Sequence, residues 1–350
     1  MMLKQTGLSL IELMISITLG LILLTGVMKV FLSSKTVYST QQALSRVQET
    51  GRLAIDFMSR DIRMAGFMGC ESNQIKGKNL NVINALKTPT DFKYNFVEAV
   101  YGYTAATVPS GLVPTPKALT DIIVVRSATG EGASVTATSD ATNINIKVTS
   151  KIDGACGTTN RVSGFCKDDL AVVTDCVKSR VFQITDISDS GLVSHVEAGT
   201  PGNAVFDWGT ETSAIYKSGA ELLLVSNTVY FIAPGTSLRP SLWQKINNGT
   251  PMELLEGVEN MSITYGVDTD ASADLIPNMY VRAGLVTAAN WKKVVSVRIE
   301  LLVASIENNV IPEVQKYSFN VAANPSPIDP GDRRLRQVFT TTIGIRSRLE

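Results

Sequence analysis

The chain has 350 residues, of which 44% are hydrophobic and 18% are charged, and its 32 basic and 32 acidic residues cancel. The length allows about two domains of ordinary size, and the apolar composition excludes an intrinsically disordered chain. A balanced charge argues against a protein that binds nucleic acid by neutralising phosphates. His195 is the single histidine, which argues against histidine-based catalytic triads and zinc sites built from several histidines.

The N-terminus combines a short polar leader with a long apolar run. Residues 1–7 contain one charged side chain, Lys4, and the apolar run extends from Leu8 to Met28. As a helix, this run spans about 30 Å, the hydrocarbon thickness of a bilayer. It is too long for a secretory signal peptide, and no small-residue cleavage site follows it. Its one ionisable side chain, Glu12, indicates a function, because a carboxylate in a membrane segment costs roughly 2.5–3.5 kcal/mol to insert.

The residues that precede and include Glu12 form a specific pattern. The stretch Gly7–Glu12, GLSLIE, resembles the processing site of type IV prepilins and pseudopilins. In that family a dedicated peptidase cuts after the glycine, and glutamate is the fifth residue of the mature chain. The resemblance implies cleavage by prepilin peptidase between Gly7 and Leu8, N-methylation of Leu8, and a role for Glu12 in subunit assembly. Most members begin the mature chain with Phe, so Leu8 departs from the pattern.

Glu12 needs a partner if it lies in lipid. A carboxylate there must be protonated, reach the interface or pair with a cation. Cleavage after Gly7 frees an amine at Leu8, one helical turn from Glu12, on the same chain or on a neighbouring subunit. Pairing between subunits would bring a new subunit into register and offset the desolvation of the carboxylate. The alternative is that Glu12 only reaches the lipid headgroups.

The helix is predicted to continue beyond the apolar run. Gly66 and Gly69 end its pattern. We therefore predict a leader (1–7), a membrane-spanning half of the helix (8–28), an amphipathic half (29–66) and a globular head (67–350). The predicted buried face of the amphipathic half recurs at helical spacing and comprises Leu44, Val47, Gly51, Ile55, Met58 and Ile62.

From Cys70 onward, the sequence predicts short β-strands separated by turns rich in proline, glycine and serine. We therefore expect an α+β fold: a long N-terminal helix packed on a head of antiparallel β-sheet, the lollipop architecture of type IV pilins. The predicted strands are Asp121–Arg126, Ile144–Val148, Leu170–Thr174, Val181–Thr185, Glu221–Val225, Thr228–Ile232, Val258–Val267, Val294–Ser305, Val314–Val321 and Gln337–Ile345.

Several later stretches resemble the PilW family, the minor pilins of Gram-negative type IV pili. These are Arg60–Phe67 with Gly69-Cys70, Thr174–Cys176 with Val181–Gln183, Glu256–Asp270, and Arg336–Arg346. The resemblance implies a head related to the J-type pseudopilins. It also implies a minor pilin that primes pilus assembly at or near the fibre tip and supports twitching motility, with adhesion or DNA uptake left open.

The same resemblance implies the partners and the location. The partners are prepilin peptidase, other minor pilins, the major pilin and the inner-membrane assembly platform, with inner-membrane lipid around the helix before assembly; nucleic acid is not indicated. The protein would cross the inner membrane once, with its head in the periplasm, and then enter the fibre at the cell surface. Two other functions remain open. A minor pseudopilin of a type II secretion system has the same start and a related head, whereas a membrane-anchored adhesin would not need Gly7 or Glu12.

The four cysteines are predicted to form disulfides. Cys156, Cys166 and Cys176 are evenly spaced, and Cys70 follows the helix. Neither the paired spacing of a zinc site nor a CxxC redox motif occurs, and disulfides are the expected state outside the cytoplasm. Among the possible connectivities we expect Cys156–Cys166, which closes a short loop, and Cys70–Cys176, which ties the exit of the helix to a strand.

The remaining candidates have simpler interpretations. Asp268, Asp270 and Asp274 loosely resemble a calcium loop but lack the glycine and terminal glutamate of an EF-hand, so we expect a solvated turn. His195 is expected at the surface or in a strand. Without a nucleophile-elbow, phosphate-loop or dinucleotide motif, we expect no catalytic residue, metal or cofactor and no enzymatic activity. The last basic residues are expected to form a solvated edge, with inter-subunit salt bridges or DNA uptake as alternatives: Arg333, Arg334, Arg336, Arg346 and Arg348.

Overall fold

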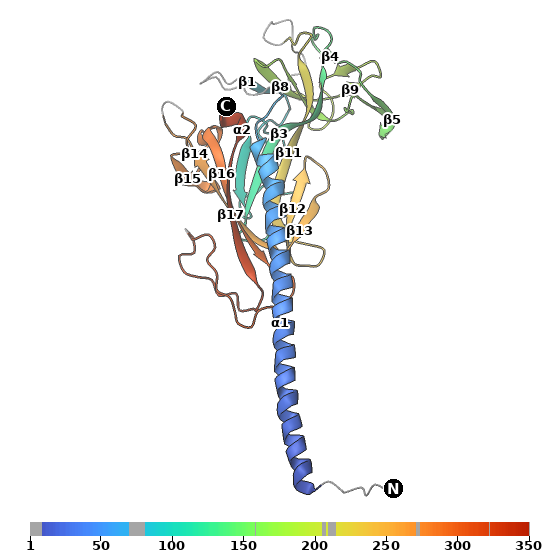
Figure 1. Cartoon of the computed structure of the whole chain (residues 1–350). Coiled ribbons are helices and arrows are strands. Elements are labelled where there is room, and N and C mark those ends of the chain that lie inside the picture. Colours follow the sequence, from blue (N-terminus) through green and yellow to red (C-terminus); the bar gives the residue numbers. More distant parts are fainter. Residues whose placement is uncertain are drawn as a thin grey trace, which may run out of the picture. The chain divides into compact units, whose positions relative to one another are not determined.

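The structure is a computed structural model (Figure 1), and it describes residues 9–69, 81–157, 159–204, 208, 215–270, 274–321 and 323–349. The chain forms two compact units. The first unit comprises Met1–Glu49 and Ala304–Gln337, and the second comprises Thr50–Val303 and Val338–Glu350.

The N-terminal helix α1 extends over 54 residues, from Leu10 to Arg63, which confirms the prediction of one long helix. The turn after it requires a glycine. Gly66 has φ = 77°, in the left-handed region that favours glycine, and its N–H donates to the Arg126 carbonyl at 2.8 Å. A Cβ atom on Gly66 would lie 2.9 Å from the Cβ of Ala99, so no larger residue fits there.

The second unit is built mainly of antiparallel β-sheet, as expected from the sequence. Its largest sheet has eight strands, ordered β1-β8-β7-β11-β12-β13, with β3 paired to β11 and β2 to β3. The pairing of β1 with β8 is parallel. The strands are β1 (Asn81–Asn84), β2 (Val100–Thr104), β3 (Asp121–Ser134), β7 (Leu170–Thr174), β8 (Lys178–Gln183), β11 (Glu221–Pro234), β12 (Pro240–Ile246) and β13 (Met252–Glu256).

Smaller sheets complete the β-structure. Their orders are β4-β10-β9, β5-β6 and β15-β14-β16-β17. The strands are β4 (Asn143–Asn145), β5 (Lys151–Cys156), β6 (Thr159–Val162), β9 (Asp186–Ile187), β10 (Leu192–Ser194), β14 (Val258–Val267), β15 (Met279–Val281), β16 (Val294–Ala304) and β17 (Arg336–Gly344). Short helical segments lie at Ala283–Leu285, Asn290–Lys293 and Arg346–Leu349.

Strand β11 is the centre of the large sheet. It pairs with β7 through Glu221–Leu224 and with β12 through Thr228–Pro234, while β3 occupies its other edge. The sequence predicts two strands here, which is wrong: Ser226 and Asn227 stay extended because they pair with Ser127 and Arg126 of β3. Polar residues inside a strand are tolerated where the ladder satisfies their backbone groups.

One predicted strand, Val314–Val321, is absent. The described part of this segment forms a single isolated bridge, between Tyr317 and Ile328, within a loop that contains four prolines, Pro312, Pro325, Pro327 and Pro330. Proline cannot donate to a β-ladder, and it restricts the residue before it. These prolines explain why an apolar alternating segment stays irregular.

The two larger sheets of the second unit pack face to face, with β14 against β3, β11 and β12. Buried apolar side chains fill the space on both sides of β11, and polar contacts fix the register between the sheets. The carboxylate of Asp121 accepts a hydrogen bond from the backbone N–H of Ile263 at 2.7 Å, and the Lys117 ammonium donates to the Glu259 carbonyl at 2.7 Å. Burial raises the pKa of Asp121.

Within the second unit, the last turns of α1 pack on the sheets through a narrow face. Ala54, Met58 and Ile62 are completely buried. Ile55, predicted in this face, is only half-buried, because small residues occupy the centre of the contact. Gly51 shows why: a Cβ atom at that position would lie 2.4 Å from the ring of Phe339 in β17.

A polar cluster fixes the same part of the helix. The Tyr230 hydroxyl donates to the Asp61 carboxylate at 2.7 Å and accepts from the Gln244 amide at 2.8 Å. Tyr230 is 1% exposed, so its hydroxyl cannot replace these bonds with water. The cluster therefore joins α1 to the neighbouring strands β11 and β12.

The first unit is organised by contacts between α1 and residues 304–337. Ala43 and Val47 are buried, whereas Leu44, which the sequence places on the buried face, is 39% exposed. Arg46 forms an ion pair with Glu307 at 2.8 Å, and the Thr40 hydroxyl donates to the Val310 carbonyl.

The polar cluster under the helix predicts a stability effect. Tyr230→Phe should lower the free energy of unfolding by about 1–3 kcal/mol, because it removes the hydrogen bonds that the buried hydroxyl makes with Asp61 and Gln244. Chemical denaturation of the detergent-solubilised full chain would measure the loss. Tyr38→Phe is the matched control, since Tyr38 is 68% exposed on the same helix. Equal effects of the two substitutions would contradict the assigned role of Tyr230.

Candidate functional site along the N-terminal helix

Glu12 lies in the first turn of α1 and is exposed. The Ser9 hydroxyl accepts a hydrogen bond from the Glu12 backbone N–H at 3.3 Å, so Ser9 caps the helix. An acidic side chain in this turn is favoured by the positive end of the helix dipole. Ser9 is not among the site residues predicted from the sequence, although Ser-x-x-Glu is a recognised capping pattern. Gly7 and Leu8, the predicted cleavage and methylation residues, lie outside the described residues.

The half of α1 that follows Glu12 presents apolar side chains on all sides. Its large apolar residues from Leu10 to Leu32 are each at least 51% exposed. In the described part of the chain, α1 is the one helix long and apolar enough to cross a membrane. Exposed apolar area on this scale requires lipid or other protein around it.

The hydroxyl side chains in this half of α1 are satisfied by the helix itself. Ser16 donates to the Glu12 carbonyl at 2.7 Å, and Thr25 donates to the Leu21 carbonyl at 2.8 Å. Thr18 makes the same contact with the carbonyl of Met14 at 3.0 Å. Such bonds to the preceding turn let a hydroxyl enter an apolar medium at little cost. Among residues 9–28, Glu12 is therefore the polar side chain that needs an external partner.

A shallow apolar groove follows one side of the exposed half. A Cβ atom on Gly20 or Gly26 would meet nothing within 4 Å, so neither glycine is required by contacts inside the chain. Gly26 instead leaves a depression that fits a ridge of side chains from another helix or an acyl chain. The residues lining the groove are Ile22, Leu23, Gly26, Val27, Val30, Phe31 and Ser34.

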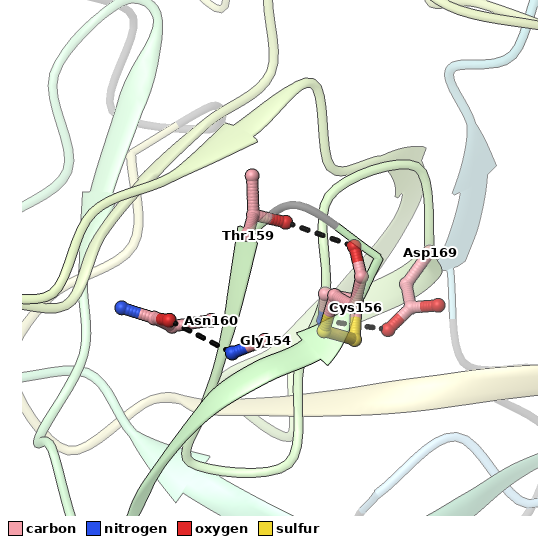
Figure 2. The surroundings of a disulfide bond; sticks show 6 residues. Gly154, Cys156, Thr159, Asn160 and Asp169 are labelled. Carbon is pink, nitrogen blue, oxygen red and sulfur yellow. Dashed lines mark hydrogen bonds between the residues drawn. A yellow bond between two sulfur atoms is a disulfide. The ribbon is translucent and has the colours of Figure 1, made fainter.

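The predicted disulfide between Cys156 and Cys166 is present, with the two Cα atoms 5.7 Å apart (Figure 2). Local contacts surround it. The Asp169 carboxylate accepts from the Cys166 backbone N–H at 2.7 Å, and the Thr159 hydroxyl donates to the Cys156 carbonyl at 3.2 Å. The bond fixes the hairpin β5–β6, whose first strand is exposed along its length. No described cysteine is a free thiol. Cys70 lies outside the described residues, so its pairing with Cys176 stays a prediction.

The three acidic residues after β14 come together, with carboxylate oxygens within 4.8 Å of one another. Their oxygens cap the turn that holds them. Asp268 accepts from the backbone N–H groups of Asp270 at 3.1 Å and Leu275 at 2.9 Å, and Asp274 accepts from Ile276 at 2.9 Å. Asp268 is buried and the other two are exposed, so the prediction of a wholly solvated turn is wrong for Asp268.

Two further expectations need correction. His195 is fully buried rather than at the surface, because its ring stacks on Trp208 with centroids 3.6 Å apart. Arg336 is not part of a solvated edge. It is 6% exposed and pairs with Asp332 at 2.5 Å, while exposed Arg333 donates to the Asn309 side chain at 2.9 Å.

Comparisons with known proteins match both ends of the chain. Residues 2–28 match the prokaryotic N-terminal methylation motif, and residues 229–347 match the family model of type IV pilus-assembly protein W. The chain is therefore similar to type IV pilus-assembly protein W over residues 229–347, and it carries an N-terminal methylation motif. Among solved structures, it is similar to a type IV-like pilin, TTHA1219 from Thermus thermophilus, with 11% sequence identity, a TM-score of 0.35, and coverage of 87% of this chain and 98% of that one. None of the curated proteins matches it.

The disulfide predicts a difference in protease sensitivity. Breaking Cys156–Cys166 should expose the hairpin to trypsin at Lys151 and Arg161, because few buried side chains hold β5 in place. Limited proteolysis of the full chain with and without reductant, followed by peptide mass spectrometry, would locate the new cuts. Cys156→Ser/Cys166→Ser should behave as the reduced protein does, and Ser150→Ala, at an exposed serine beside the hairpin that leaves the disulfide intact, should behave as wild type. Unchanged cleavage at Lys151 and Arg161 would show that the bond does not hold the hairpin.

Proposed function

We propose that this chain is a minor pilin that primes assembly of a type IV pilus and occupies a position at or near the fibre tip. One observation carries the proposal: an exposed apolar helix begins within the methylation motif of residues 2–28 and holds Glu12 in its first turn. Such a surface is stable in lipid before assembly and among the helices of other pilins afterwards. The protein would act as a structural subunit, supporting fibre biogenesis and twitching motility.

The proposed topology follows from the same helix. Leu8–Met28 would cross the inner membrane of a Gram-negative cell, with Lys4 on the cytoplasmic side. The remaining chain would lie in the periplasm, and the Cys156–Cys166 disulfide suits that oxidising compartment. Prepilin peptidase would remove residues 1–7 and methylate Leu8. The assembly platform, the major pilin and other minor pilins would then be its partners.

A J-type pseudopilin of a type II secretion system is the second candidate. It would use the same processing motif and the same apolar helix, so α1 does not separate the two functions. The match of residues 229–347 to the pilus-assembly model favours the pilus.

The proposed processing predicts a mass change. In Gly7→Val the bulkier side chain should keep the scissile bond away from the peptidase, since close backbone approach at this position favours glycine. The membrane fraction should then contain uncut precursor, heavier than the mature chain by the leader. Mass spectrometry of the purified protein would measure the difference. Gly20→Val, on the same helix, should be cut normally, and normal cutting of Gly7→Val would overturn the assigned site.

The proposed role of Glu12 predicts a loss of assembly without a loss of insertion. In a strain lacking the native gene, Glu12→Ala should reach the membrane in normal amounts but enter the fibre poorly, because the carboxylate that would pair with a subunit amine is gone. Immunoblots of sheared fibres and of membranes would separate the two effects. Glu49→Ala is the matched control, an exposed glutamate on the polar part of α1.

The same strains distinguish the functions. Loss of surface pili and twitching in the deletion strain, with normal exoprotein secretion, supports the minor pilin. Loss of secretion with intact pili would favour the pseudopilin. Equal fibre incorporation of Glu12→Ala and wild type would leave Glu12 as a residue at the lipid headgroups.

A further inference from the structure

The side of α1 that faces away from the sheets of the second unit carries two adjacent strips of exposed side chains. Helix positions advance by about 100° per residue, so spacing shows which residues share a side. One strip is charged and the other is apolar, and together they are called the outer face here. The charged strip comprises Arg52, Asp56, Arg60 and Arg63, all exposed. The apolar strip comprises Leu53, Phe57 and Met64, the residue after the helix, which are 40%, 44% and 36% exposed.

The charged strip has an uncompensated positive charge. Three arginines and one aspartate leave a local charge of +2 at neutral pH. Within the described part of the chain, none of these four side chains forms an ion pair. An acidic partner can therefore pair with the arginines without breaking any ion pair inside the chain, and arginine is well suited to bind carboxylates with two parallel hydrogen bonds.

The apolar strip favours a protein partner over a lipid surface. More than half of each of its three side chains is already covered by the rest of the chain, so their conformations are restricted and binding costs them less entropy. A helix that lies on a membrane buries its apolar face about 5–10 Å deep, and side chains that are mostly covered cannot reach that depth. Phenylalanine, methionine and arginine are also enriched at protein interfaces.

The turn between β14 and β15 has the complementary chemistry. Asp270 and Asp274 are exposed, and neither forms an ion pair with another described residue. Near them in sequence, Ile276 and Met279 are 63% and 45% exposed. Asp270 accepts one hydrogen bond from the Asn278 amide and Asp274 accepts one from the backbone of Ile276. Since a carboxylate accepts about four, both can still bind a guanidinium, and their joint charge of −2 balances that of the charged strip.

We infer that the outer face of α1 in one copy of the chain binds the β14–β15 turn of a second copy. The apolar side chains of both surfaces supply the buried area, and the opposite charges orient the contact. Because two different surfaces meet, the contact is head to tail, and each copy keeps a free surface to which another copy can add. The inference goes beyond the proposed function, since neither surface includes the methylation motif or Glu12.

Sedimentation velocity of the full chain, in an excess of detergent, tests the contact. We expect species larger than one chain to appear as the protein concentration rises, with a Kd of about 1–100 μM, as for a small interface. Raising the salt concentration from about 0.1 M to about 1 M should weaken the association, because the charges at the edge of the contact are then screened.

Charge reversals assign the contact to these residues. Arg60→Glu and Asp274→Arg should each raise the Kd about tenfold or more, since like charges then face each other. An equimolar mixture of the two variants should form a dimer and stop there, because the intact outer face of one meets the intact turn of the other. This result would also show that both variants are folded. Arg161→Glu and Glu131→Arg, at exposed positions of β6 and β3, should associate as wild type does.

Two results would overturn the inference. A single species of one chain at every protein concentration up to about 100 μM would show that the outer face does not bind a second copy. Association of wild-type strength in both Arg60→Glu and Asp274→Arg would place the contact elsewhere, such as on the exposed apolar half of α1.

Discussion

The structure depends on one physical constraint: a single continuous helix must be exposed and apolar in its first half and packed against β-sheet in its second half. Backbone hydrogen bonds within α1 are complete wherever it lies, so the side chains alone decide which medium each turn tolerates. Around Leu10–Leu32 they are large, apolar and exposed, whereas from Gly51 to Ile62 the buried ones include the small residues Gly51 and Ala54, which allow close packing. The division between these halves is set by the sequence of the helix rather than by any break in it.

Close packing at the second half explains the position of several specific residues. Gly51 leaves room for the ring of Phe339, and Gly66 turns the chain beside Ala99. Between them, Asp61 bonds to Tyr230. Shape complementarity sets how closely the helix approaches the strands. The hydrogen bond between Asp61 and Tyr230 fixes the rotation of the helix about its axis and its position along that axis. A purely apolar contact would leave that register less well defined.

The elements that could be predicted are those whose information is local. Helix α1, strand β7 and strand β14 follow from periodicity and from runs of β-branched residues bounded by turns, and both strands have the predicted bounds. The polar hairpin β5–β6 has no apolar alternation, so periodicity could not find it. The continuity of β11 depends on pairing with β3, which is distant in sequence. Likewise, burial of His195 depends on a stack with Trp208, and no local pattern records such a contact.

For the candidate site, the sequence shows which residues carry reactive or charged groups more readily than it shows how those residues are buried or paired. Glu12 is recognisable because a charge in an apolar run is rare. The cysteines are recognisable as disulfides because their spacing fits neither a zinc site nor a CxxC redox motif. The ion pair between Arg336 and Asp332 and the burial of Arg180 arise from tertiary structure. Their residue types are those of ordinary surfaces, so composition gives no signal that they are buried.

The hydroxyl groups of Ser16, Thr18 and Thr25 have a consequence for the proposed transfer of α1 from a bilayer into a fibre. Each donates to a carbonyl of the preceding turn, so the partner of each bond travels with the helix. Extraction from a bilayer into a protein assembly then requires no exchange of these bonds and adds no barrier from them. Such a transfer would change the surroundings of the aliphatic side chains and of one carboxylate. For the aliphatic side chains, contact with acyl chains and contact with leucines of other helices have nearly the same free energy. The direction of such a transfer would then be decided by the partner that the carboxylate of Glu12 finds.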